Sequence, residues 1–307
     1  MTTFNEVRTA ALKKGVKTVA VAAAADAPVL EAVRDAVAGG YAKAILVGDS
    51  DAIAAYAGGI GLALDGKWVK VMHESTAKDA ADTAARLVHN GKADILMKGL
   101  IPSADFLRAV LDKERGLRTD HGLTAVGIAE MPSLERLLVM ADGGLHTYPD
   151  LKGKIDIVSG IGTVCTALDI RQPKVAAVCA VEVVNPKMQP TLDAAELQRM
   201  SRAGIFGSMI VEGPLSLDIA LSPEAARHKG MIGSVVAGKA DALLMPNIET
   251  GNVFWKTITH FSDALEFAGV VAGAAAPVIM TSRADSAQTK LNSIALAILM
   301  CGGNTHE

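Results

Sequence analysis

The fold is decided by the stretch PVIMTSRADSAQTKLNSIALAIL, which runs from Pro277 to Leu299. It begins with a short apolar run and passes through a polar turn into apolar residues at helical spacing. The pattern predicts a strand, a tight turn and a helix. Such a turn suits an anion, because a helix N-terminus carries unpaired N–H groups and a partial positive charge. Arg283 adds a planar fork of donors, although Asp285 or Ser286 could be a simple helix cap.

Short apolar runs alternate with amphipathic segments through the rest of the chain. Strands are predicted at residues 17–26, 42–50, 68–73, 93–99, 174–182, 208–215 and 240–247, and helices at 28–40, 77–91, 102–114, 150–170, 192–204 and from about 253. Strands this apolar are buried on both faces and need helical crossovers, so the fold class is α/β with mostly parallel sheets. Two runs without a helix between them, 123–131 and 136–142, predict an antiparallel pair.

The length of 307 residues predicts two domains. The final strand and helix are too short to form a domain, so we expect them to return to the first sheet. The first α/β/α domain is therefore predicted over residues 1–137 plus 277–307. The second α/β/α domain is predicted over 138–276, with a cleft between the two.

The composition excludes several classes of protein. A net charge of -3 and 4% aromatic residues disfavour nucleic acid and anionic membranes as partners. No apolar stretch reaches the length of a membrane-spanning helix and the N-terminus does not resemble a signal peptide, so we expect a soluble protein. Cys165, Cys179 and Cys301 show no paired spacing, which indicates buried thiols in a reducing cytoplasm.

Polar residues follow the predicted strands, where open α/β sheets bind ligands. Those that we expect to contact substrate are Lys98, Ser103, Arg118, Asn185, Lys187, Asn252, Ser282 and Arg283. Cations, amides and hydroxyls with few paired carboxylates predict an anion-binding crevice. The alternatives are ordinary surface positions for the lysines and a turn-forming role for the asparagine that precedes Pro186.

Motifs for other chemistries are absent from the sequence. It has no Gly-x-x-x-x-Gly-Lys-Ser/Thr loop and no Gly-x-Gly-x-x-Gly after the first strand, which disfavours ATP bound by that loop and a Rossmann-bound nicotinamide. It also lacks a Gly-x-Ser-x-Gly elbow. The seven histidines show no metal-ligand spacing, so we expect no metal.

Four stretches resemble the phosphate acyltransferases, the group of phosphotransacetylase and phosphate butyryltransferase. They are LMKGLIPSADFLRAVL (96–111), VEGPLSLDIALSPEAARHKG (211–230), VAGKADALLMPNIETGN (236–252) and TSRADS (281–286). The short length and the stretches VNPKM and SPEAARHKG are more similar to the butyryl branch.

The resemblance implies a fold like that of isocitrate and isopropylmalate dehydrogenases, with the active site between two domains. It implies a homodimer or larger homo-oligomer, no cofactor or metal, and coenzyme A as a substrate or product. The reaction would transfer a short acyl group, butyryl or acetyl, from acyl-CoA to phosphate. Arg283 and Arg118 match the family's substrate-binding arginines, and Ser282 and Ser103 match its hydroxyl residues.

One position departs from the family pattern. Acetyl-type members carry an aspartate proposed to take the thiol proton, and this chain has Thr289 there. Asp285 is the nearest acidic substitute, so we expect it to handle that proton in a direct transfer within a ternary complex. Ser282 is expected to donate to the thioester carbonyl or the thiolate.

Other functions fit the same sequence. They are an acyl-ACP:phosphate acyltransferase, a metal-dependent dehydrogenase of the same fold and a non-enzymatic protein that binds CoA or acyl phosphate. The acyl chain stays open as well, because one methylene changes binding in a pocket by about 1–3 kcal/mol and the linear sequence does not give the pocket volume.

Overall fold

A computed structural model describes residues 1–262 and 265–302. The chain divides into two compact units: unit 1 comprises residues 1–3 and 122–265, and unit 2 comprises 4–121 and 266–307. The predicted boundary at 137/138 lies inside one strand of an antiparallel pair. The predicted boundary at 276/277 lies between the two strands of another antiparallel pair. Each unit keeps both strands of its pair, because the ladder hydrogen bonds join them.

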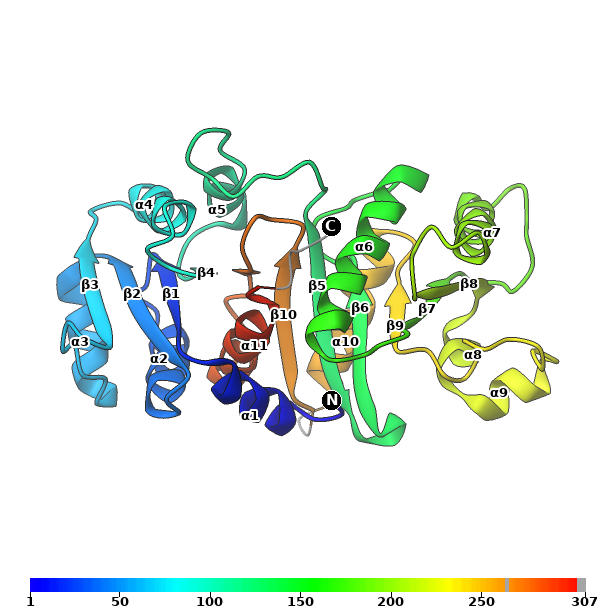
Figure 1. Cartoon of the computed structure of the whole chain (residues 1–307), viewed down its shortest axis with the longest axis horizontal. Helices are drawn as coiled ribbons and strands as arrows, with labels where there is room; N and C mark the ends of the chain where they lie inside the picture. The colour runs from blue at the N-terminus through cyan, green and yellow to red at the C-terminus, as the bar shows by residue number, and fades with distance from the viewer. Residues whose placement is uncertain (263–264, 303–307) are drawn as a thin grey trace. The chain divides into compact units, whose positions relative to one another are not determined.

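The sheet of unit 2 has the strand order β3-β2-β1-β4-β11-β10 (Figure 1). Its strands are β1 (Lys17–Ala22), β2 (Ala42–Gly48), β3 (Val69–His73), β4 (Ile95–Lys98), β10 (Phe267–Ala272) and β11 (Val278–Ile279). All neighbours are parallel except β10 and β11. Val278 pairs with Leu96 on β4, so the last strand returns to the first sheet as predicted. Strand β10 was not predicted from the sequence, because its glycine and alanine residues lack the large apolar side chains by which a buried strand is recognised.

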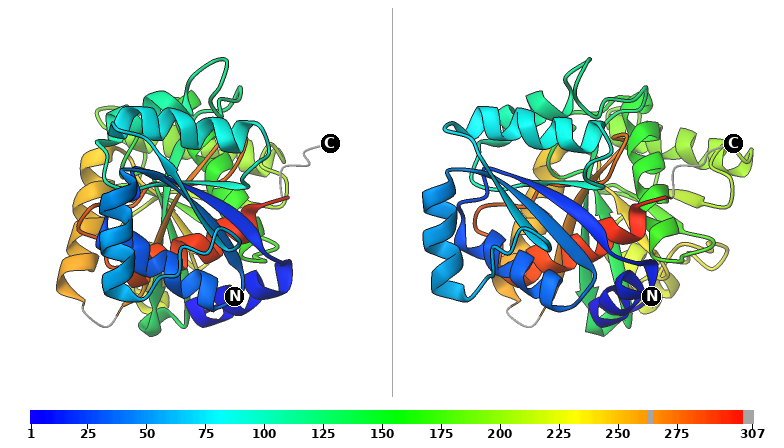
Figure 2. Two further views of the ribbon diagram at one scale, coloured as in Figure 1. Left: turned by 90° about the vertical axis from the view of Figure 1, so that its left-hand side faces the viewer. Right: turned by 60° about the vertical axis from the view of Figure 1, so that its left-hand side comes forward.

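Helices cover both faces of the unit 2 sheet. They are α1 (Phe4–Lys14), α2 (Ala27–Ala38), α3 (Ser50–Ile60), α4 (Ala77–His89), α5 (Ser103–Val110) and α11 (Ala287–Met300). Helix α11 packs against β10, α1 and α2, whereas α4 packs against β1, β2 and α5. In Figure 2 the red α11 and the cyan α4 lie on opposite sides of the strands. Because the sheet and two helices surround α11, every residue from Thr289 to Met300 is buried.

The sheet of unit 1 has the order β5-β6-β9-β7-β8. Its strands are β5 (Thr124–Met131), β6 (Arg136–Ala141), β7 (Lys174–Val178), β8 (Ile210–Leu215) and β9 (Ala242–Leu244). Strands β5 and β6 form the predicted antiparallel pair, with a 3-10 turn (Pro132–Leu134) between them, and the other neighbours are parallel. The α/β class with mostly parallel strands is confirmed for both units.

Five helices accompany this second sheet in the described part of unit 1. They are α6 (Leu151–Ala167), α7 (Gln189–Arg202), α8 (Leu217–Leu221), α9 (Pro223–His228) and α10 (Ile248–Phe261). Helices α6 and α7 contact the strands, and residues of α8, α9 and α10 surround a core that includes Leu138, Met140 and Leu243. Helix α10 begins five residues before its predicted start, because the Asn247 side chain accepts the N–H of Thr250 at 3.0 Å and caps it.

All three cysteines are free and buried, as predicted. Burial raises the pKa of the Cys165 thiol to about 12 and those of Cys179 and Cys301 to about 11, so these thiols stay protonated at neutral pH. Among the described helices, none is long and apolar enough to cross a membrane.

Candidate active site

Strands β1, β4 and β11 end side by side in unit 2. Ala22 is level with Lys98, and Ile279 is level with Met97, so three carboxyl ends meet at one edge. The chain leaving β4 stays against β1, since the N–H of Gly99 donates to Ala22 O at 2.8 Å. A Cβ on Gly99 would lie 2.7 Å from that carbonyl oxygen, so only glycine fits this close approach.

Lys98 is buried at this edge without a carboxylate partner. It is 4% exposed, its Nζ lies 3.4 Å from Gly99 O, and it forms no ion pair within residues 1–262 and 265–302. Burial lowers the pKa of Lys98, and the charges of Arg283 and Lys290 lower it further, whereas the carboxylates of Asp26 and Asp285 partly oppose this shift. A buried ammonium beside other cations is costly unless an anion joins it, so this edge is suited to an anionic ligand.

The turn after β11 presents Ser282 and Arg283. The N–H of Ser282 donates to Asp285 Oδ2 at 2.7 Å, and the N–H of Asp285 donates back to Ser282 O at 3.2 Å. Ser286, and not Asp285, caps α11 by accepting the N–H of Thr289 at 3.1 Å. The Arg283 side chain is exposed. The carboxylate of Asp285 therefore stabilises the turn, which leaves Arg283 open to a ligand.

Lys290 is a residue that the sequence analysis did not single out. It is 2% exposed on α11, and its Nζ donates to Asp285 O at 2.6 Å and to Ser282 O at 3.2 Å. The signal that could have identified it is its place one turn before the uniformly apolar run from Ile294 to Met300 of the same helix.

Ser103 and Arg118 also belong to unit 2. Ser103 is the exposed first residue of α5, and Arg118 is exposed in the loop that follows this helix. That loop is held to the chain after β10, because Thr119 Oγ1 donates to Gly273 O at 2.5 Å and the N–H of Ala275 donates to Leu117 O at 2.9 Å. The backbone beside Arg118 is thus fixed while its side chain faces solvent.

The other three candidates, Asn185, Lys187 and Asn252, belong to unit 1. Asn185 forms a turn, since its Oδ1 accepts the N–H of Lys187 at 3.0 Å, and the Lys187 side chain is exposed. Asn252 Nδ2 donates to Gly143 O at 3.1 Å. The observed contacts of Asn185 agree with its alternative role as a turn former.

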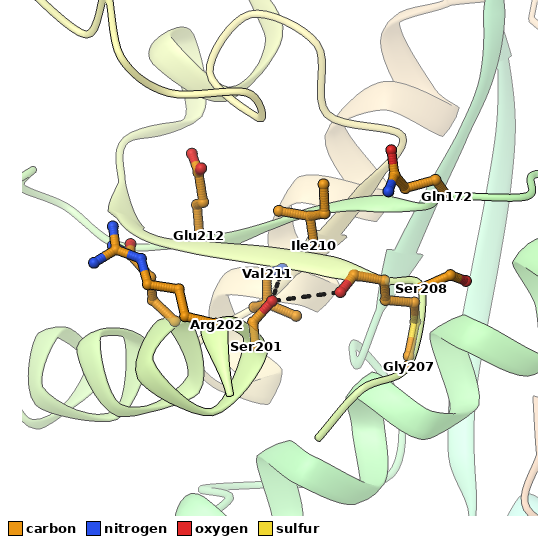
Figure 3. A pocket seen from close by; sticks show the side chains of 10 residues that line it. Gln172, Ser201, Arg202, Gly207, Ser208, Ile210, Val211 and Glu212 are labelled. Carbon is orange, nitrogen blue, oxygen red and sulfur yellow. Dashed lines mark hydrogen bonds between the residues drawn. The ribbon is translucent and has the colours of Figure 1, made fainter. Parts of the chain in front are cut away.

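A cavity of about 230 Å³ lies between α7 and β8 (Figure 3). Its lining includes Arg202 and Glu212 but none of the predicted substrate-binding residues. Two of its polar side chains form hydrogen bonds with the backbone of β8. Ser201 Oγ accepts the N–H of Val211 at 2.9 Å, and Gln198 Oε1 accepts the N–H of Gly213 at 3.0 Å. Within the described parts of the chain, no group of three His, Cys, Asp or Glu side chains is placed to hold a metal ion.

Comparison with known proteins assigns the chain to a family. Residues 69–298 match the family described as "Phosphate acetyl/butaryl transferase". A phosphate butyryltransferase of Clostridium acetobutylicum is 54% identical over 299 residues, which cover 97% of this chain and 98% of that protein.

Solved structures support the same assignment. A branched-chain phosphotransacylase from Enterococcus faecalis has a TM-score of 0.79 and 28% identity, with 93% of this chain and 99% of that chain covered. A 4-hydroxythreonine-4-phosphate dehydrogenase from Klebsiella pneumoniae shares the fold alone, with a TM-score of 0.53, 11% identity and coverage of 94% and 99%. The chain is therefore a transferase and belongs to the phosphate acetyl/butyryl transferase family.

Proposed function

We propose that this transferase moves a short acyl group, butyryl in the first instance, from acyl-CoA to inorganic phosphate. The observation that carries the proposal is the unpaired cationic edge of unit 2, where the buried Lys98 and the exposed Arg283 meet beyond β4 and β11. The names of the relatives support the reaction, since one is a phosphate butyryltransferase and another a branched-chain phosphotransacylase.

Phosphate would bind to the cations of this edge. Arg283 offers a fork of N–H donors that matches two phosphate oxygens, and Lys98 supplies a point charge whose pKa stays lowered although Asp26 and Asp285 act against the shift. Arg118 is the second arginine of the proposed clamp. The exposed arginine side chains can close on the anion, whereas the backbone on which each stands is held by hydrogen bonds.

The proposed chemistry is a direct attack within a ternary complex. An oxygen of HPO₄²⁻ attacks the thioester carbonyl carbon, the C–S bond breaks, and the proton of the phosphate ends on the CoA thiolate. Ser282 donates a hydrogen bond to the carbonyl oxygen or the departing sulfur, where negative charge develops. Asp285 relays the proton. An Asp285→Asn variant that kept the wild-type pH profile of kcat would contradict this relay.

The test is release of free CoA thiol from acetyl-, propionyl-, butyryl- and isobutyryl-CoA, with and without phosphate and with and without EDTA. We expect release that requires phosphate, is greatest with a four-carbon chain and is unchanged by EDTA. Failure to release CoA from any of the four would contradict the proposal, and loss of activity in EDTA would contradict its metal-free site.

A further inference from the structure

Two lysines are buried next to the turn that carries Arg283, and their ammonium groups have different surroundings. The Nζ of Lys98 has one long contact, at 3.4 Å, to Gly99 O within the described chain. The Nζ of Lys290 makes two shorter hydrogen bonds, at 2.6 Å to Asp285 O and at 3.2 Å to Ser282 O. Lys290 therefore uses two of its three donors on the backbone of the turn, whereas the one long contact of Lys98 leaves more of its donors for a ligand.

The two carbonyl groups bound by Lys290 lie on either side of Arg283 in the chain. The same two residues are joined by the bonds between Ser282 and Asp285, at 2.7 and 3.2 Å. Lys290 thus connects a four-residue turn to the buried helix α11, whose residues from Thr289 onward are all buried. The result is a rigid backbone under an arginine whose own side chain is exposed.

The charge of Lys290 is also available to the turn. Lys290 forms no ion pair with a described residue, and its two partners are carbonyl oxygens. Burial lowers the pKa of Lys290, whereas the charges of Asp285 and Asp26 raise it. A cation that is buried in this way adds to the positive potential of the anion site without occupying it.

We propose that Lys290 is a positioning residue for phosphate. Its ammonium group holds the carbonyls of Ser282 and Asp285, and this orients Arg283 toward the anion. Lys290 does not touch the substrate. This inference rests on the proposed function and adds to it the residue that prepares the turn for phosphate.

The neighbouring polar residues of α11 provide a matched control. Asn292 is 0% exposed, and its Nδ2 donates to Glu266 Oε2 at 2.9 Å and to Phe267 O at 3.2 Å, away from the turn. Its Oδ1 accepts from Arg8 at 2.6 Å. An Asn292→Ala variant therefore removes buried hydrogen bonds from the same helix without touching residues 282–285.

The experiment compares Lys290→Met and Asn292→Ala with the wild type by steady-state kinetics and thermal unfolding. Losing Lys290 releases the turn that carries Arg283 from its buried support, so we expect the KM for phosphate to rise about tenfold or more in Lys290→Met. The KM for butyryl-CoA should change by less than about twofold, because the proposed hydrogen bond from Ser282 in the same turn forms where charge develops in the transition state, so its loss would lower kcat. Asn292→Ala should lower Tm and leave the KM for phosphate unchanged.

A second variant keeps the test decisive if Lys290→Met does not fold. Lys290→Gln retains amide donors for the two carbonyls but has no charge, and we expect a smaller rise in the KM for phosphate. An unchanged KM for phosphate in the folded variant would overturn the proposal. So would an equal rise in Asn292→Ala, which would mean that any loss of stability has this effect.

The inference and the proposed function fail in different ways. A wild-type protein that releases no CoA in the presence of phosphate would remove both. An active wild type whose KM for phosphate does not depend on Lys290 would leave the transferase reaction intact and remove only the role of Lys290.

Discussion

Each unit buries a lysine side chain, Lys154 in unit 1 and Lys98 in unit 2, and the two have different partners. In unit 1, Lys154 on α6 is 4% exposed, and its Nζ lies 2.6 Å from Asp193 Oδ2 on α7. In unit 2, Lys98 is equally buried at 4% and has no carboxylate partner among the described residues. The first is a closed ion pair that joins two helices. The second forms no ion pair with a described residue, so in the proposed function its charge is available to phosphate.

The different partners of the two lysines support the proposed anion site in unit 2. Both lysines lose hydration on burial. Lys154 offsets that cost with a direct ion pair to Asp193, whereas the carboxylates that act on Lys98, those of Asp26 and Asp285, form no ion pair with it. The carboxylate of Asp193 is further satisfied by Gln189 Nε2, which donates to it at 2.8 Å. The lack of a direct ion pair to a described residue, rather than the number of basic residues, is what distinguishes Lys98 at the edge formed by β4 and β11 from Lys154.

The largest effect should come from removing the arginine of the turn. Arg283→Ala deletes the proposed phosphate fork, and loss of one such donor typically lowers kcat about 10²–10³-fold. The measurement is kcat/KM for CoA release at limiting phosphate. Arg34→Ala, which removes an arginine from α2, is the matched control and should stay near the wild-type value. Near-normal turnover by Arg283→Ala would contradict the assignment.

The ion pair of unit 1 should respond as a structural element. Lys154→Met leaves the buried Asp193 carboxylate unpaired, so we expect a loss of about 3–5 kcal/mol in the free energy of unfolding. Adding Asp193→Leu should recover most of that stability, because both charges are then gone. Chemical denaturation measures both values. A double variant that is no more stable than the single variant would show that the pair is not the cause.

Lys98→Met should behave in the opposite way. Removing an unpaired buried charge should raise Tm or leave it unchanged, while the KM for phosphate should rise about tenfold or more. Thermal unfolding and phosphate-dependent kinetics on the same preparation separate the two effects. A Lys98→Met protein that unfolds as easily as Lys154→Met would erase the difference between the two lysines.

The smallest effect is a pH dependence of that stability difference. Because the pKa of Lys98 is lowered in the folded state, the unfolded chain binds more protons between the lowered pKa and 10.5. The wild type therefore gains stability relative to Lys98→Met as the pH rises through this range. Denaturation curves of both proteins from neutral pH upward should show the advantage of Lys98→Met shrinking. An advantage that stayed constant with pH would contradict an ionised, penalised Lys98.

Much of the fold could be predicted from the sequence, because its strands are uniformly apolar and its helices amphipathic. The return of β11 to the first sheet followed from the shortness of the last strand and helix, and Val278 does pair with Leu96. Strand β10 was missed, since Gly269 and its alanine neighbours lack the side chains on which strand patterns rest. The short helices α8 and α9 were also missed, because five or six residues show no helical period.

The candidate site was less predictable than the fold. The order of strands identified the edge where Lys98, Ser282 and Arg283 lie, but not the partners of each side chain. Whether Asp285 or Ser286 caps α11 depends on one hydrogen bond, from the N–H of Thr289 to Ser286 Oγ. The contacts of buried lysines depend on tertiary packing, and no local pattern records that packing.

The most direct test of the account is to locate the bound anion. Arsenate has the shape and charge of phosphate, and arsenic can be found by anomalous scattering in crystals soaked without acyl-CoA. We expect arsenate at the carboxyl ends of β4 and β11, with its oxygens within hydrogen-bonding distance of Lys98 Nζ and the Arg283 guanidinium. Arsenic in the cavity between α7 and β8, beside Arg202, with none at Lys98, would contradict it.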